Sequence, residues 1–171
     1  MKNSPEHKTI LNIYAALTVS LLMSFLPMMS AAFLALAMFL GVWIAAYVIR
    51  SKSEHDSLSF DHMTFVIRTI WISGLFAVIT TSIAGMYVIS VVDSTAVMAC
   101  ASSVSTSLDM KAMEAAVQPC MDQFLQDNMS EFIKGTLIAA GPLVVYLGYR
   151  LSKGLSRALK GHRIGDVKNW F

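Results

Sequence analysis

Hydrophobic residues gather into four long runs along the chain instead of forming one apolar face of a soluble helix. No charged side chain occurs between Lys8 and Arg50, and such a stretch is too long and too uniformly apolar for a soluble amphipathic helix. We therefore predict membrane-spanning helices at about residues 10–26, 28–49, 65–92 and 132–149. A bilayer core needs about 20 helical residues, so all four runs are long enough and the third has length to spare for tilt.

Pro27 separates the first two runs, and proline typically ends one helix or opens the next. We expect a tight helical hairpin there, because the alternative is a single kinked helix of about forty residues, roughly twice what a bilayer core requires. Gly141 and Pro142 predict a kink in the fourth span. The predicted fold class is therefore an all-α integral membrane protein with four transmembrane helices.

Composition agrees with this interpretation. The chain has 171 residues, of which 56% are hydrophobic and 14% are charged, whereas soluble domains carry about 25% charged residues. A soluble protein of this length would have difficulty covering so much apolar surface. We treat residues 1–171 as a single membrane domain.

The basic residues predict the orientation of the chain. Eleven of the thirteen Lys and Arg residues lie before the first span, around residues 50–68 or after the fourth span. The connection formed by residues 93–131 is acidic and contains only one lysine, Lys111. The positive-inside rule then predicts that both termini lie in the cytoplasm. We expect the protein to reside in the inner membrane of a bacterium.

Residues 93–131 are expected to form an extracytoplasmic helical hairpin that contains both cysteines. Apolar residues recur there at helical spacing, with a break expected near Pro119. Cys100 and Cys120 would face an oxidising periplasm, where disulfides persist. Closing a loop of about twenty residues contributes about 3 kcal/mol in the chain-entropy account. We expect a disulfide in preference to a metal site, because no histidine accompanies these cysteines in the connection.

Three ionisable residues at the start of the third span, Asp61, His62 and Arg68, form a candidate intramembrane polar site. Three interpretations stay open for Arg68, because its side chain can reach the phosphate headgroups, bind a buried partner or take part in transport. Hydroxyl residues in the spans can bond the carbonyls of their own helix. Small residues recur at four-residue spacing, for example Ala77, Thr81 and Gly85. This spacing favours close helix packing and, as a second use, a homo-oligomer.

The C-terminal tail, residues 150–171, is predicted to be a basic amphipathic helix on the inner membrane surface. We expect the following residues to contact lipid there: Arg150, Lys153, Arg157, Lys160, Arg163 and Trp170. The alternative is a solvated basic flank that only sets topology. Nucleic acid is not expected as a partner, because the basic cluster directly abuts a span.

Catalytic motifs are absent from the sequence: we find no Walker loop, HExxH, GxSxG, CxxC or paired carboxylates. We expect no enzymatic activity, no catalytic or metal-binding residues and no cofactor. The leading hypothesis is a membrane scaffold or accessory subunit whose partners are lipids and other membrane or periplasmic proteins. The alternative is a subunit of a channel or small transporter.

Two segments carry a resemblance. The segment HMTFVIRTIWISGLF contains Arg68, Thr69 and Trp71, and the tail contains Arg150, Gly154, Gly161 and Trp170. Together they resemble a group of small bacterial membrane proteins related to a chloroplast inner-envelope import component, the Tic-twenty-like group. The resemblance covers about a third of the chain and implies a four-helix membrane fold with no established chemistry.

Overall fold

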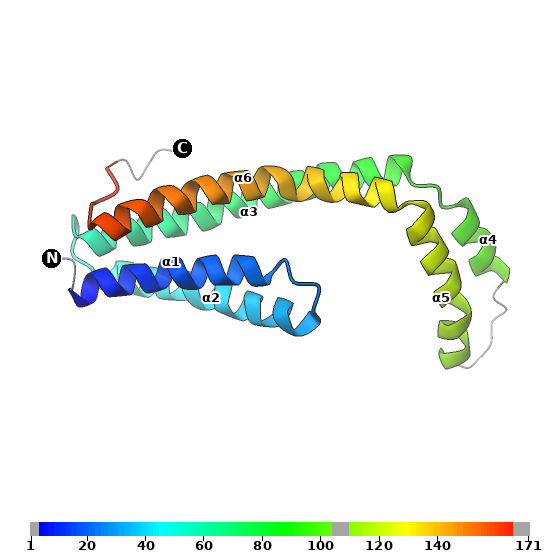
Figure 1. The fold of residues 1–171 in the computed structure, drawn as a ribbon, viewed down its shortest axis with the longest axis horizontal. Coiled ribbons are helices and arrows are strands. Elements are labelled where there is room, and N and C mark those ends of the chain that lie inside the picture. Colours follow the sequence, from blue (N-terminus) through cyan, green and yellow to red (C-terminus); the bar gives the residue numbers. More distant parts are fainter. Residues whose placement is uncertain (1–3, 104–109, 166–171) are drawn as a thin grey trace. The chain divides into compact units, whose positions relative to one another are not determined.

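The computed structural model describes residues 4–103 and 110–165, and this part of the chain forms six α-helices and no strand (Figure 1). The helices are α1 (Pro5–Met23), α2 (Met29–Lys52), α3 (Leu58–Val91), α4 (Thr95–Ser103), α5 (Met110–Asp127) and α6 (Met129–Lys160). The chain divides into two compact units. We call Met1–Leu75 with Val144–Phe171 the bundle unit, and Phe76–Leu143 the hairpin unit.

Three helices, α2, α3 and α6, are long and apolar enough to cross a membrane. They indicate a multi-pass membrane protein, because most of their apolar side chains are exposed and need lipid or another protein to cover them. The first predicted span corresponds to α1, which is not one of these three helices. Glu6, His7 and Lys8 occupy the first turn of α1. The apolar part that follows, Ile10 to Met23, is only about 21 Å long, against a bilayer core of about 30 Å.

Helix α3 begins earlier than predicted and α6 ends later. Ser57 accepts a hydrogen bond from the backbone N–H of Phe60 (3.2 Å), so α3 starts before Asp61 and His62. Helix α6 continues without a break through residues 150–160, so the described helical part of the basic tail extends the fourth predicted span instead of forming a separate helix. Pro119 and Pro142 lie inside α5 and α6, and the break expected near Pro119 does not occur.

Gly161 ends α6 in a left-handed conformation, with a φ of 70°. The backbone N–H of His162 donates to the carbonyl of Arg157 (3.0 Å), and that of Gly161 donates to Ala158 (2.9 Å). This pair of bonds is a Schellman motif, in which a glycine adopts the conformation that reverses the chain. The residues after Gly161 therefore leave the helix axis.

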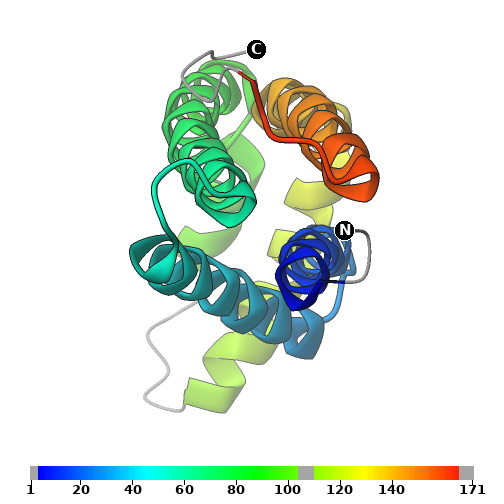
Figure 2. The same ribbon diagram turned by 90° about the vertical axis from the view of Figure 1, so that its left-hand side faces the viewer.

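The core of the bundle unit lies between α1, α2, the first part of α3 and the last part of α6, which Figure 2 shows end-on. Helix α1 contributes Ile10, Ile13, Tyr14 and Leu17, whose spacing places them on one helical face. Gly154 of α6 packs directly against Tyr14. A Cβ atom added to Gly154 would lie only 2.6–2.8 Å from three atoms of the Tyr14 side chain. Only glycine permits this approach of α1 and α6.

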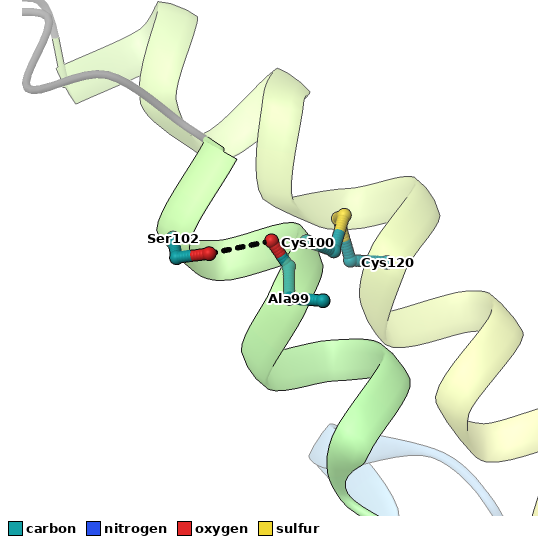
Figure 3. Close-up of a disulfide and its surroundings, with 4 residues drawn as sticks. All are labelled: Ala99, Cys100, Ser102 and Cys120. Atoms are coloured by element: carbon teal, nitrogen blue, oxygen red, sulfur yellow. Dashed lines mark hydrogen bonds between the residues drawn. A yellow bond between two sulfur atoms is a disulfide. The ribbon is translucent and has the colours of Figure 1, made fainter.

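In the hairpin unit, a disulfide between Cys100 and Cys120 joins α4 to α5, as predicted, with the two Cα atoms 6.1 Å apart (Figure 3). Asn128 holds the other end of the hairpin. Its side chain accepts a hydrogen bond from the N–H of Asp93 (3.1 Å) and donates one to the carbonyl of Asp93 (3.2 Å). Hydrogen bonds from Thr95 hold the pKa of the Asp93 carboxyl below its usual range.

The same unit contains the last part of α3 and the first part of α6, and polar contacts join these two segments. The Thr80 hydroxyl donates to the Ala139 carbonyl (2.8 Å), and the Tyr87 hydroxyl donates to Glu131 (2.5 Å). Glu131 also forms an ion pair with Lys134 (2.7 Å). These contacts fix the register between the two helices within the unit.

Gly154→Ala is predicted to destabilise the protein by about 1–3 kcal/mol, because the new methyl group overlaps the rigid, buried Tyr14 ring. Gly148→Ala is the matched control: it also lies in α6, but open space surrounds the position of its Cβ. Unfolding in detergent micelles measures both variants, and Gly148→Ala should be neutral or slightly stabilising. Equal stability of the two variants would contradict the close packing of α1 against α6.

Candidate functional site

The ring of His62 lies at the centre of a buried polar network in the bundle unit. The side chain is fully buried. Its Nε2 donates to the backbone carbonyl of His162 (3.1 Å), and its Nδ1 accepts from the hydroxyl of Tyr14 (3.1 Å). A carbonyl can only accept, so Nε2 carries the hydrogen, and in the neutral ring Nδ1 is then the acceptor of the Tyr14 hydroxyl. Both ring nitrogens of His62 therefore form hydrogen bonds with groups of the same chain.

Arg150 is the second buried member of the network. Its side chain is fully buried, its Nε donates to the Thr69 hydroxyl (3.1 Å), and its guanidinium carbon lies 3.8 Å from the centroid of the Phe65 ring. Phe65 and Thr69 are four residues apart on α3, so one helical face supplies both contacts. Arg68 directly precedes Thr69 in α3, so a second arginine lies beside the residue that Arg150 binds.

Residues Gly161–Gly165, which we call the strap, fold back onto the start of α3. Arg163 forms ion pairs with Asp61 (2.6 Å) and Asp56 (3.1 Å), and these carboxylates raise the pKa of its guanidinium. Arg157 donates to the carbonyl of Arg163 (3.1 Å). Ile164 inserts into the core and is only 3% exposed. The strap is thus attached by charge, hydrogen bonds and apolar burial together.

The start of α1 also contacts the start of α3. Glu6 accepts a hydrogen bond from the backbone N–H of Ser59 (2.9 Å), which is one of the N–H groups left without a partner in the first turn of α3. A carboxylate in this position also interacts favourably with the helix dipole. The N-terminus of α3 is therefore held by α1 and by the strap.

The prediction that Arg150 contacts the membrane surface is wrong, because the side chain is buried. The reason is the phase of α6: Tyr146, Arg150, Gly154 and Ala158 follow one another at four-residue spacing and form its buried face. Lys153 and Arg157 are half-buried, and Lys160 is exposed. Arg163 is paired with acidic residues of its own chain. Trp170 lies outside the described residues.

The structure connects the three residues of the predicted polar site to the tail. Asp61 and His62 bind the strap, and Arg68 directly precedes the residue that Arg150 binds. Tyr14 was not predicted from the sequence, although its place in the apolar repeat of α1 is a usable signal, since a buried tyrosine hydroxyl usually has a partner. Within residues 4–103 and 110–165, no group of three His, Cys, Asp or Glu side chains could hold a metal ion.

The hydroxyl residues of the spans bind within the protein. Thr64, Ser73 and Thr81 each donate to a carbonyl one turn earlier in α3. Such bonds satisfy the hydroxyl without a ligand. The arrangement as a whole is suited to holding α1, α3, α6 and the strap together.

Comparison with protein families, curated proteins and solved structures finds no match for this chain. The resemblance to the Tic-twenty-like group stays a prediction from the two segments that carry it.

Thr69→Val is predicted to lower the free energy of unfolding by about 1 kcal/mol, because it removes the oxygen that accepts from buried Arg150 while keeping the shape of the side chain. Thr81→Val is the matched control, since Thr81 is exposed and bonds only carbonyls of α3. Denaturant unfolding in micelles compares them. If the two variants were equally stable, Thr69 would not hold Arg150.

Asp61→Asn should loosen the strap, because it removes the closer of the two carboxylates that pair with Arg163. Trypsin cleavage between Arg163 and Ile164 is expected to become several-fold faster, and high salt should accelerate cleavage of the unmodified protein in the same direction. Asp56→Asn is the control with the smaller expected effect, since its carboxylate is more exposed and more distant. Mass spectrometry of the fragments follows the cut. Unchanged cleavage in Asp61→Asn would show that charge does not hold the strap.

Proposed function

We propose that this protein is a non-enzymatic scaffold or accessory subunit of a complex in the bacterial inner membrane. The observation that supports the proposal best is the internal use of its polar groups. In the bundle unit, His62 and Arg150 bind groups of the same chain instead of lining an open site. The described chemistry of this unit therefore favours holding helices in place over conversion of a substrate.

The hairpin unit is the proposed docking surface for a membrane or periplasmic partner. Within this unit, the hairpin formed by α4 and α5 is tied at two places, by the Cys100–Cys120 disulfide and by the hydrogen bonds between Asn128 and Asp93. Between them, α5 exposes both apolar and polar side chains, including Met121, Asp122 and Leu125. A small rigid surface of mixed polarity is typical of a non-obligate interface. The basic end of α6 would provide a second contact, with lipid or protein.

For the topology, we propose four crossings, with α1 as the fourth, and both termini in the cytoplasm. The distribution of Lys and Arg supports this arrangement. The disulfide also favours a hairpin in an oxidising compartment. Because the apolar part of α1 is short, its crossing would depend on packing against α2 and α6 more than on its own length.

A subunit of a channel or small transporter is the second candidate. One observation favours it: Arg150 of α6 binds Thr69, which directly follows Arg68 in α3, so two arginines lie in the same part of the bundle unit, as in an anion path. Reconstituted liposomes test it directly, because Arg68→Gln should then change an anion flux. Absence of any flux in the unmodified protein removes this candidate.

Breaking the disulfide should release partners from the scaffold. We expect the double variant Cys100→Ser/Cys120→Ser to lose most of the proteins that copurify with the unmodified protein from gently solubilised membranes, because the hairpin loses its tie. Gly148→Ala, in the bundle unit, is the control and should retain them. Quantitative mass spectrometry of the purified complexes provides the measurement.

Two outcomes count against the proposal. The unmodified protein could emerge alone from the membrane, or the double variant could retain the same proteins in the same amounts. The topology is checked separately by reducing cells whose outer envelope has been opened and adding an impermeant thiol reagent, which should label both cysteines. Labelling only after rupture of the inner membrane would reverse the proposed orientation.

A further inference from the structure

The exposed face of α2 changes its chemistry over about two helical turns. Ile44 is 62% exposed and Tyr47 is 41% exposed, and the exposed Lys52 follows at the end of the helix. Toward the end of α2, the exposed side chains thus change from aliphatic residues such as Ile44, through Tyr47 and Val48, to the cationic Lys52. This is the order of environments from the hydrocarbon core of a bilayer to its headgroups.

The same sequence of side chains occurs on α6 in the bundle unit. Val145 is 73% exposed and Tyr149 is 49% exposed. One turn further on, the Lys153 ammonium lies 5.5 Å from the centroid of the Tyr149 ring. On α3, Trp71 is 60% exposed, and the next exposed large hydrophobic residue on the side away from the chain termini is Leu75, at 53%. Each of these three helices therefore carries an exposed tyrosine or tryptophan near the point where its exposed side chains change from mostly aliphatic to more polar.

Contacts within the bundle unit place these aromatic residues at one level. The indole N–H of Trp71 donates to the hydroxyl of Tyr47 (2.9 Å). Tyr149 directly precedes Arg150, whose Nε binds Thr69, two residues before Trp71. Because each helical residue advances by about 1.5 Å, Tyr149 and Trp71 lie within about one turn of each other along α3. Trp43 packs edge-on against Trp71, with ring centroids 5.7 Å apart.

We propose that Tyr47, Trp71 and Tyr149 form an aromatic belt that binds the glycerol and headgroup region of the lipids in the leaflet nearest the chain termini. Tyrosine and tryptophan are favoured at this depth because one part of each side chain is apolar and another forms hydrogen bonds. Lys52 and Lys153, on the side of the termini, complement the lipid phosphates. The proposal rests on the membrane location inferred above.

The belt assigns a depth to the rest of the bundle unit. His62 precedes Trp71 by nine residues in α3, which corresponds to about 14 Å toward the termini. Asp61, His62 and the strap then lie among the headgroups or in water, and only Arg150 with Thr69 lies at the hydrocarbon boundary. The polar network would be a closed cap on the membrane surface instead of a site in the hydrocarbon core.

Tryptophan fluorescence in brominated liposomes tests this depth. The variant Trp43→Phe/Trp170→Phe retains only Trp71, and Trp71→Phe/Trp170→Phe retains only Trp43. Each is reconstituted into vesicles of mixed zwitterionic and anionic lipids, with bromine near the carbonyl end or near the methyl end of the acyl chains. We expect Trp71 to be quenched about twofold more by the bromine near the carbonyl end, and half-buried Trp43 to be quenched less by both.

Flotation of the vesicles tests the membrane location of the protein separately from the aromatic belt. Protein that does not float with the lipid refutes the membrane location, and the belt with it. Protein that floats but shows stronger quenching of Trp71 near the methyl end refutes the belt alone. Weak quenching of Trp71 by both lipids would also refute it, because a protein surface, such as that of a second copy, would then cover the aromatic residues.

Discussion

The guanidinium of Arg150 is fully buried, and inside a bundle surrounded by apolar solvent such a group must be satisfied by the chain itself. Thr69 and Phe65 supply two of its contacts from one face of α3, and they thereby fix how α6 lies against that helix. One turn later on α6, Gly154 lets the ring of Tyr14 approach. Tyr14 in turn reaches His62. The position of α1 thus depends on how α3 and α6 meet.

The strap completes this series of contacts. Because Gly161 reverses the chain directly after α6, the carbonyl of His162 is placed where the Nε2 of His62 needs an acceptor. Arg163 then reaches Asp61, a residue 102 positions earlier in the sequence. A surface ion pair alone contributes little to stability. In the strap it acts together with a buried hydrogen bond and with Ile164 in the core, so the segment is held by several weak contacts at once.

The sequence was sufficient to predict features that depend on one segment at a time. Long apolar runs predicted α2, α3 and α6, and the location of both cysteines in one connection predicted their disulfide. The role of Arg150 could not be predicted in this way. A count of basic residues treats it like its exposed neighbours, whereas its burial depends on the phase of α6 relative to α3. The short apolar length of α1 was visible in the sequence, but Pro27 set the predicted boundary beyond the end of the helix at Met23.

The two units are stabilised by different interactions. The bundle unit can bury an apolar core between four helices, so its polar groups need only be satisfied locally. The hairpin of α4 and α5 has nine and eighteen residues in its helices, and so small an element cannot bury enough apolar surface to remain ordered alone. A disulfide limits its unfolded conformations, and Asn128 binds both backbone groups of Asp93 at its base. A segment fixed at both ends loses little further entropy when a partner binds. This preorganisation is the physical reason why we propose recognition at the hairpin, with the bundle unit as its proposed anchor in the membrane.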